Sequence, residues 1–109
     1  KKRAVNSKVN LIDRLAQEKG NLMDIGCGTG DFLVACKKNG WNTTGIEPNE
    51  KARKLGLEKL ESSSGQNTEG KIFQDIKEYR NTIEKDKRET KFDVITLWHV
   101  LEHVPSITE

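Results

Sequence analysis

The residues best placed for chemistry are an acid and three glycines in residues 22–30, Leu-Met-Asp-Ile-Gly-Cys-Gly-Thr-Gly. A short apolar run that contains Asp24 ends in Gly26, Gly28 and Gly30. Because glycine has no Cβ, a turn rich in it can bring backbone N–H groups close to a ligand. A buried acid is costly unless it is paired, so Asp24 either braces this loop or faces a cationic group of the ligand. The segment predicts a strand, a tight ligand-binding loop and a helix.

Two further acids stand where the next predicted strands end. Glu47 lies 19 residues after Gly28 and is followed by Pro48. A carboxylate there can accept two hydrogen bonds from the vicinal hydroxyls of a ribose, although a strand-end acid can also simply face solvent. Asp75, at the end of the third strand, either caps the following helix or accepts a hydrogen bond from an adenine amino group. These positions predict a nucleoside pocket beside the glycine loop.

The spacing of the glycines distinguishes this loop from two well-known phosphate-binding loops. The third glycine comes one residue too early for Gly-x-Gly-x-x-Gly, and position 31 is Asp31. This disfavours a dinucleotide-dependent oxidoreductase, which stays an alternative that NADH fluorescence on mixing would reveal. No Gly-Lys-Ser/Thr follows, so the loop is not a P-loop.

His99, Glu102 and His103 form a second candidate cluster, His-x-x-Glu-His. On a helix these residues share one face and could hold zinc, as in one group of metallopeptidases. A peptidase would leave the glycine loop unexplained, and no further ligand cluster follows. The other interpretations are a divalent ion that assists an acceptor substrate, His103 as a base, or polar residues at a pocket rim. Two cysteines outside any Cys-x-x-Cys pair are expected to be reduced thiols, so we predict no resident metal.

Alternating helices and strands must position these residues. We expect strands at Asn21–Ile25, Asn42–Ile46, Lys71–Gln74 and Phe92–Trp98. We expect helices from Ser7 to about Lys19, over residues 31–38, from an Asn49 cap onward, around Ile76, Tyr79 and Ile83, and over His99–Val104. The predicted apolar faces are Val9, Ile12, Leu15 and Ala16 in the first helix, and Ala52, Leu55, Gly56 and Leu60 in the third. Residues 61–70 and 84–91 are expected to be loops.

This alternation predicts an α/β fold with a Rossmann-like, doubly wound parallel sheet in the order 3-2-1-4 and helices on both faces. The winding reverses between strands one and four, which opens a crevice at their carboxyl ends. A chain of 109 residues is enough for one domain, so we expect residues 1–109 to form a single unit.

Composition excludes several function classes. The chain has 19 basic and 17 acidic side chains, and a net charge of +2 gives no push toward nucleic acid or an anionic membrane. No apolar run approaches the ~20 residues of a membrane span, and no signal peptide is visible, so we expect a cytoplasmic protein. Trp41 and Trp98 are expected to pack rather than to stack on bases. Because the first residue is not Met, we expect a piece of a longer chain.

Four segments, LMDIGCGTGDFL, TTGIEPNEKA, FQDI and FDVITLWHVLEHVP, resemble the successive motifs of class I S-adenosylmethionine-dependent methyltransferases in order and spacing. The resemblance runs from about residue 8 to the end, and the last segment is most similar to small-molecule methyltransferases. It implies a seven-stranded sheet of which this chain holds the first four strands. The fourth strand would then have an unpaired edge through which two chains could associate.

The resemblance also implies roles for individual residues. The backbone of the glycine loop would line the methionine part of the cofactor: Gly26, Cys27, Gly28, Thr29 and Gly30. Asp24 would act near the ammonium group, Glu47 would hold the ribose hydroxyls, and Pro48 would flank the adenine. Asp75 and Ile76 would contact the adenine amino group and ring. The pocket would be closed beside the sulfonium by Leu97, Trp98 and His99.

The function implied is methyl transfer from S-adenosylmethionine to an unidentified small-molecule acceptor, with this chain as the cofactor-binding core. His99 and His103 are the candidate catalytic residues, since a general base is needed only when the acceptor carries a proton. The alternatives are a non-catalytic S-adenosylmethionine-binding module and the zinc peptidase.

Overall fold

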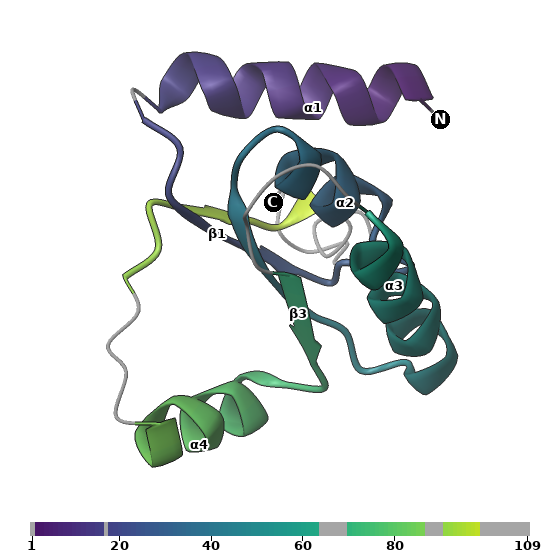
Figure 1. Cartoon of the computed structure of the whole chain (residues 1–109), viewed down its shortest axis with the longest axis vertical. Helices are drawn as coiled ribbons and strands as arrows, with labels where there is room; N and C mark the ends of the chain where they lie inside the picture. Colours follow the sequence, from purple (N-terminus) through teal and green to yellow (C-terminus); the bar gives the residue numbers. More distant parts are fainter. Residues whose placement is uncertain (1, 17, 64–69, 87–90, 99–109) are drawn as a thin grey trace, which may run out of the picture.

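The computed structural model describes residues 2–16, 18–63, 70–86 and 91–98. Helices and strands alternate along the chain (Figure 1). In order they are α1 (Lys2–Leu15), β1 (Asn21–Ile25), α2 (Asp31–Lys38), β2 (Asn42–Ile46), α3 (Glu50–Ser62), β3 (Gly70–Phe73), α4 (Ile76–Asp86) and β4 (Val94–Thr96). Strands β1 and β2 and helix α2 have the bounds that the sequence predicts.

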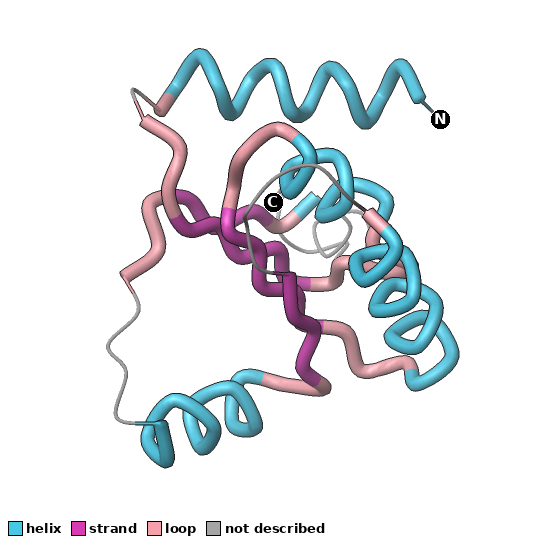
Figure 2. The backbone as a smooth tube through the Cα atoms, viewed as in Figure 1, coloured by secondary structure: helices cyan, strands magenta, loops and turns pink. Residues whose placement is uncertain are grey.

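The four strands form one parallel sheet in the order β3-β2-β1-β4, which confirms the predicted topology. The chain steps outward from β1 to β2 to β3 and then crosses to the other side of β1, so the winding reverses between β1 and β4. In register, Asp24 of β1 lies between Gly45 of β2 and Thr96 of β4. The carboxyl ends of all four strands therefore meet at one edge of the sheet, from which the glycine loop leaves (Figure 2).

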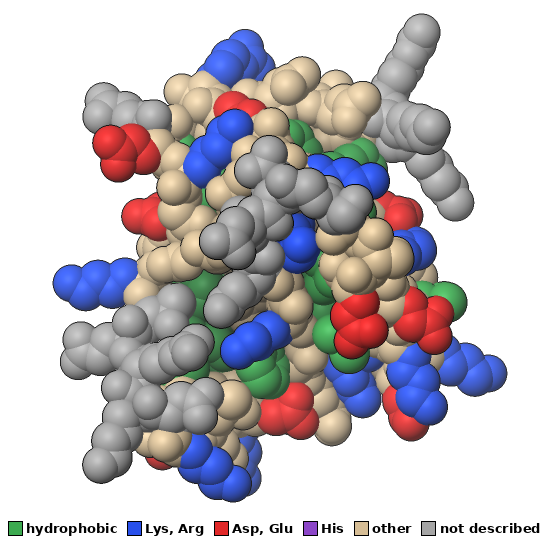
Figure 3. All heavy atoms as spheres, viewed as in Figure 1, with side chains coloured by type: hydrophobic (Ala, Val, Ile, Leu, Met, Phe, Trp, Pro, Cys, Tyr) green, Lys and Arg blue, Asp and Glu red, His purple; other side chains and the backbone are tan. Residues whose placement is uncertain are grey.

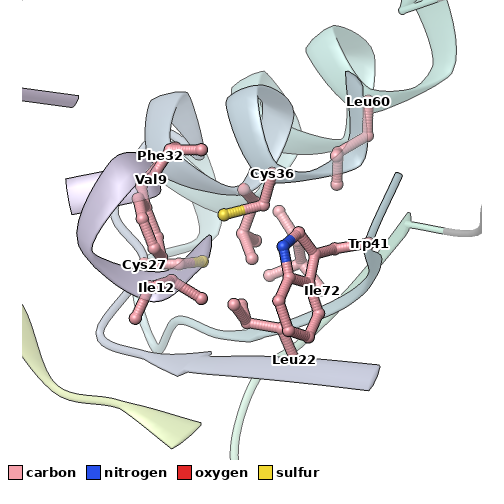
Figure 4. Packing of buried hydrophobic residues seen from close by; sticks show 10 residues of the cluster. Val9, Ile12, Leu22, Cys27, Phe32, Cys36, Trp41, Leu60 and Ile72 are labelled. Atoms are coloured by element: carbon pink, nitrogen blue, oxygen red, sulfur yellow. The ribbon is translucent and has the colours of Figure 1, made fainter. Parts of the chain in front are cut away.

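Three helices cover one face of the sheet. Helix α2 packs against both α1 and α3, and its inward residues Phe32, Leu33 and Cys36 are at most 3% exposed. Their spacing of i, i+1 and i+4 places them on one side of the helix. They join a single apolar cluster with residues from both neighbouring helices and the sheet (Figure 4), which includes Val9, Ile12, Leu22, Cys27, Trp41, Leu60 and Ile72.

Helix α1 is fixed to this layer by a buried polar contact. Asp13 accepts a hydrogen bond from Trp41 Nε1 at 3.2 Å and another from the side-chain amide of Asn39. Trp41 is completely buried, so its indole N–H would lose a hydrogen-bond partner without this acceptor. The predicted packing role of Trp41 is confirmed, and α1 is anchored to the turn between α2 and β2.

The second face of the sheet is covered by α4. Tyr79 of this helix is buried against Met23 and Ile46, and its ring contacts those of Phe73 and Phe92 edge-on or tilted, with centroids 5.5 and 5.7 Å away. Helices on both faces of a parallel sheet make the three-layer, Rossmann-like fold that the alternation predicts. Ile95 of β4 lies on this same face, in register with Met23, and is 56% exposed.

Two apolar faces were predicted too widely. Leu15 is 73% exposed, because it lies about 120° around the helix from Val9 and is the last residue of α1. Leu55 is 48% exposed, because it is displaced by about 100° from its buried neighbour Gly56. Both side chains therefore leave the buried stripe of their helix.

Several predicted boundaries are also wrong. Helix α1 begins at Lys2 rather than Ser7, since residues 2–6 contain no helix breaker, and it ends at Leu15 rather than near Lys19. Helices α3 and α4 extend to Ser62 and Asp86, into segments predicted as loops. Strand β3 starts one residue earlier and ends at Phe73, and β4 pairs with β1 over three residues only, Val94–Thr96. The predicted helix over His99–Val104 lies outside the described residues.

Candidate ligand-binding site at the carboxyl ends of the strands

The glycine loop is built from three residues in the left-handed region of backbone conformation. Gly26, Gly28 and Gly30 have φ of 75°, 59° and 82°, values that residues with a Cβ rarely adopt. The N–H groups of Gly26 and Cys27 both donate to the carbonyl of Ile46, at 2.8 and 3.2 Å, which ties the loop to the end of β2. A further hydrogen bond from Gly30 N to Cys27 O, at 3.1 Å, closes the turn into α2.

Two of these glycines have different surroundings. A Cβ placed on Gly28 would meet no atom within 4 Å, so this residue faces open space. A Cβ placed on Gly30 would lie 3.2 Å from the Cα of Gly56 in α3, so this residue is packed against a helix. The middle of the loop thus keeps room for a ligand, while its end is part of the protein interior.

The Cys27 side chain points away from the open side of the loop. It is 2% exposed and lies in the apolar cluster near Val9, Ile12 and Phe32 (Figure 4). Burial, reinforced by the charges of Asp24 and Glu47, raises the pKa of its thiol to about 12. Cys36, which is completely buried in α2, has a pKa raised to about 12 chiefly by burial. Both remain neutral thiols at physiological pH, so neither is a nucleophile.

Glu47 joins the loop to the next strand. Its Oε1 accepts a hydrogen bond from the N–H of Gly28 at 2.8 Å, and its Oε2 accepts one from the N–H of Asn49 at 3.0 Å. The half-buried carboxylate is therefore fixed between the glycine loop and the start of α3. Each carboxylate oxygen has a second lone pair, so both oxygens can accept a further hydrogen bond.

Arg53 holds the backbone that carries Glu47. Its Nη1 donates to the carbonyls of Glu47 and Pro48, at 2.9 and 3.1 Å. Asn49 caps α3 as predicted, by accepting a hydrogen bond from Ala52 N at 2.9 Å. The turn between β2 and α3 is thus fixed at both ends. Arg53 was not predicted as a site residue, because its position carries no motif signal. Its contact with the turn depends on the fold.

Asp24 lies below the loop and is completely buried in the sheet. Its Oδ1 accepts a hydrogen bond from the hydroxyl of Thr96, the residue directly opposite on β4, at 2.7 Å. A buried carboxylate needs such donors, because removal from water otherwise costs several kcal/mol, roughly 2–7 even for neutral groups. Asp24 is therefore hydrogen-bonded across the sheet to β4, through a donor that the sequence did not predict, and the predicted brace of the glycine loop stays a prediction.

Asp75 caps α4. Its Oδ1 accepts a hydrogen bond from Glu78 N at 2.8 Å, while Glu78 Oε1 accepts one from Gln74 N at 3.1 Å. This reciprocal pairing resembles a capping box. The helix-cap alternative for Asp75 is therefore confirmed, and its second carboxylate oxygen stays available for a ligand role. Ile76 packs at the margin of the second apolar cluster, and Pro48 is exposed.

Leu97 and Trp98 follow β4 at the same edge of the sheet. Leu97 is 39% exposed. Trp98 packs edge-on against Phe32, with ring centroids 5.8 Å apart, and lies below the ammonium group of Lys8, 5.2 Å from the ring centroid. The predicted packing role of Trp98 is therefore confirmed, and it links β4 to α1 and α2. His99, Glu102 and His103 lie outside the described residues.

Three further observations on the described ranges concern metal binding, membrane crossing and surface charge. Within them, no group of three or more His, Cys, Asp or Glu side chains is arranged to hold a metal ion. Nor does any helix in this part of the chain have the length and apolarity that a bilayer crossing requires. On the face shown in Figure 3, basic and acidic side chains are interspersed.

The sequence-predicted site residues therefore fall into two groups. Gly28 and Glu47, distant in the sequence, are in direct contact, and Asp24 is buried in β1, the strand that leads into the loop, where it bonds to Thr96. Asp75 and Ile76 lie at the end of β3 and interact mainly with α4. Three residues that contribute to the site were missed, namely Arg53, Thr96 and, as a contact of the loop, Gly56. Only Gly56 had a usable signal, because a glycine inside a helical pattern weakens the helix and so points to a packing or functional reason.

Comparison with known proteins gives a consistent family. A family model described as a methyltransferase domain matches residues 2–109. The ubiquinone biosynthesis O-methyltransferase of Pseudomonas aeruginosa (strain UCBPP-PA14) is 33% identical over 100 residues, which cover 90% of this chain and 40% of the relative. The enzyme of the same name from Nitrosospira multiformis is 33% identical over 103 residues, covering 90% of this chain and 38% of the relative. The chain thus spans about 40% of the length of these relatives.

Solved structures agree with the fold. Magnesium protoporphyrin IX methyltransferase from Synechocystis PCC 6803, solved with bound S-adenosylmethionine, superposes with a TM-score of 0.67 at 23% identity, covering 94% of this chain and 46% of that one. At that identity the likeness concerns the fold alone. An S-adenosylmethionine-dependent methyltransferase from Methanosarcina mazei is 26% identical with a TM-score of 0.52, covering 58% of this chain and 31% of the other.

Proposed function

Because this chain belongs to the methyltransferase domain family, as one of the class I S-adenosylmethionine-dependent methyltransferases, we propose that it binds S-adenosylmethionine at the carboxyl ends of β1 and β2 and serves methyl transfer to a small-molecule acceptor. The observation that carries this proposal is the contact between Gly28 and Glu47. The glycine faces open space, and its N–H lies 2.8 Å from a carboxylate oxygen that keeps a free lone pair. Open space beside the loop backbone therefore lies next to a carboxylate that could accept hydrogen bonds from sugar hydroxyls.

The methionine part of the cofactor is assigned to the glycine loop. The backbone of Gly26–Gly30, Thr29 included, would line it, and the positive φ values aim the peptide groups in a way that a chain with side chains could not. Cys27 would contribute only its backbone, because its side chain lies in the core. Asp24 would act on the ammonium group through its charge, held below the loop by Thr96.

The adenosine part is assigned to the ends of β2 and β3. Glu47 would accept hydrogen bonds from the ribose hydroxyls with the lone pairs that Gly28 and Asn49 do not use. Pro48 would flank the adenine, and Asp75 with Ile76 would contact its amino group and ring. Leu97, Trp98 and His99 would close the pocket on the β4 side.

The chain's own contribution to the reaction is alignment and exclusion of water. When bound, S-adenosylmethionine supplies a methyl group that its sulfonium makes electrophilic. The glycine loop, tied to β2, and the fixed Glu47 would hold the two halves of the cofactor in place, which would lower the entropic cost of an in-line displacement. A base such as His99 or His103 would be needed only to remove a proton from the acceptor. Because the relatives are O-methyltransferases of ubiquinone biosynthesis, a hydroxyl-bearing small molecule is the first acceptor to test.

Calorimetric titration of the intact polypeptide with S-adenosylhomocysteine tests the proposal. We expect Glu47→Ala to weaken binding by about 1–3 kcal/mol, the scale for losing charge-assisted hydrogen bonds. Glu50→Ala is the matched control, because Glu50 is an exposed acid whose partner is Lys54 one turn further along α3. An unchanged dissociation constant for Glu47→Ala would contradict the ribose assignment, and no heat with the wild type would contradict cofactor binding. Binding without methyl transfer to any hydroxyl acceptor would favour the non-catalytic module.

A further inference from the structure

Helix α3 contains a glycine that its own stability does not explain. Gly56 is buried in the middle of this 13-residue helix. Glycine is among the poorest helix formers, because it loses more conformational freedom than alanine when the helix forms. Its presence in the helix therefore points to a packing or functional reason.

The neighbours of Gly56 are the glycine loop and β3. A Cβ at position 56 would lie 2.6 Å from the Cδ1 of Ile72 and 3.3 Å from the carbonyl oxygen of Thr29. From the opposite side, a Cβ on Gly30 would lie 3.2 Å from the Cα of Gly56. The backbones of α3 and of the loop are thus in contact through two residues that lack side chains.

These two neighbours can respond to a side chain in different ways. The Cδ1 of Ile72 is the end of a flexible side chain, which can turn away by changing rotamer. The carbonyl of Thr29 is backbone, and it lies between Gly28, which faces open space, and Gly30, which is packed. It can move only if the loop moves with it. A side chain at position 56 would therefore displace the part of the loop that faces the ligand.

Helix α3 also carries the other half of the site. It begins at the Asn49 cap, whose N–H holds Glu47 Oε2, and Arg53 in its first turns holds the carbonyl of Glu47. About one turn further along, Gly56 meets Thr29 and Gly30. One rigid element therefore sets the position of both the carboxylate and the loop.

We propose that Gly56 is a positioning residue for cofactor binding. Its lack of a side chain sets how closely the Thr29–Gly30 backbone approaches α3, and hence where that backbone lies relative to Glu47. The proposal rests on the proposed function, since the loop must be the one that receives S-adenosylmethionine. Gly56 itself is buried and contacts the protein only. It acts through the loop.

The test introduces Gly56→Ala into the background of a second substitution, Ile72→Val. Ile72→Val removes the Cδ1 atom that the new methyl group would meet, so that in the double variant only the contact with Thr29 is left. We expect Gly56→Ala/Ile72→Val to bind S-adenosylhomocysteine about 3- to 10-fold more weakly than Ile72→Val, because displacements of less than 1 Å already impair alignment. The thermal midpoint should change little, because the higher helix propensity of alanine offsets the cost of displacing the loop. Leu55→Ala, at an exposed neighbouring position, is the control and should leave affinity unchanged.

A loss of affinity without a loss of stability distinguishes positioning from a purely structural role, in which the two fall together. Equal affinities of the double variant and Ile72→Val would overturn the proposal, as would unfolding of the double variant. A second measurement does not depend on the cofactor: the amide hydrogen of Gly28, bonded to Glu47, should exchange faster in the double variant than in Ile72→Val. If the wild type binds no S-adenosylhomocysteine, the proposed function fails. The exchange experiment then still decides whether Gly56 positions the loop, and an unchanged rate overturns that.

Discussion

The two halves of the glycine loop have the same backbone conformation and opposite surroundings. Gly28 and Gly30 are both left-handed, with φ of 59° and 82°, yet one faces open space and the other contacts the backbone of α3. Cys27, beside Gly28 in the sequence, belongs with the packed half because its side chain lies in the core. Two glycines separated by one residue thus have different roles. Gly28 leaves open space beside the loop, and Gly30 allows the backbones of the loop and α3 to pack together.

This difference indicates that stability and ligand binding are separable within the five residues Gly26–Gly30. Changes to the packed half, Cys27 and Gly30, should reduce the free energy of unfolding. Changes to the open half, Gly28, should reduce affinity at a small cost in stability. The following predictions test that separation, in order of decreasing effect on stability.

Gly30→Ala should have the largest effect. It adds a Cβ 3.2 Å from the Cα of Gly56 and places alanine at a φ of 82°. We expect a loss of about 2–4 kcal/mol in the free energy of unfolding, measured by urea denaturation, from strain and overpacking together. Gly40→Ala is the matched control, because Gly40 has a φ of 101° but its nearest neighbour is the flexible side chain of Lys19. Equal losses in both variants would show that the contact with Gly56 adds nothing.

The thiol of Cys27 should make stability depend on alkaline pH. Its pKa of about 12 in the folded protein exceeds the ordinary value of 9.0, so between pH 9 and 12 the unfolded chain binds fewer protons than the folded one. Stability is therefore fully present below pH 9 and falls as pH rises, by roughly 1 kcal/mol per pH unit for this thiol. Urea unfolding at pH 8 and pH 10 under reducing conditions measures the slope, and Cys27→Ala should make it shallower. The same slope in both proteins would place this side chain on the open half.

Gly28→Ala should have the smallest effect on stability and a large one on binding. No atom lies within 4 Å of the new Cβ, so only the backbone conformation is penalised, at about 1 kcal/mol. The methyl group would occupy the space assigned to the cofactor, and we expect S-adenosylhomocysteine affinity to fall by about 1–3 kcal/mol, the usual cost of overpacking. Gly28→Asn should be better tolerated in folding, because asparagine enters the left-handed region more readily, and should bind more weakly still. Affinity that survives both substitutions would remove Gly28 from the site.

Much of the fold was predictable because local and long-range signals agree around the loop. Strands β1 and β2 and helix α2 have the predicted bounds, since glycines, Pro48 and the turn at Asn39 and Gly40 confine them on each side. The order of the strands followed from alternation and the handedness of crossovers alone. The ends of α1 and β4 were not predicted correctly, and β4 is limited to the three residues that pair with β1, which the local sequence does not specify.

The position of the candidate site was predictable from the sequence, but the hydrogen-bond partners of its residues were not. Glu47 was expected at the end of a strand, yet the hydrogen bonds that its carboxylate makes to Gly28 and Asn49 depend on how the loop folds back. The partnership of Asp24 and Thr96 depends on the register between β1 and β4, which residues 72 positions apart do not reveal. Arg53 was invisible for the same reason, since its role is to hold backbone carbonyls that carry no sequence signal.

The hydrogen bond from Gly28 to Glu47 has an evolutionary consequence. One carboxylate holds the loop and, under the proposed function, would also bind the sugar, so a mutation at position 47 would alter the two features together. A descendant of this protein that came to use a nucleoside without its vicinal diol would keep the acid for the sake of the loop. An acid conserved at this position among descendants would then reflect the structure of the loop as much as the identity of the ligand.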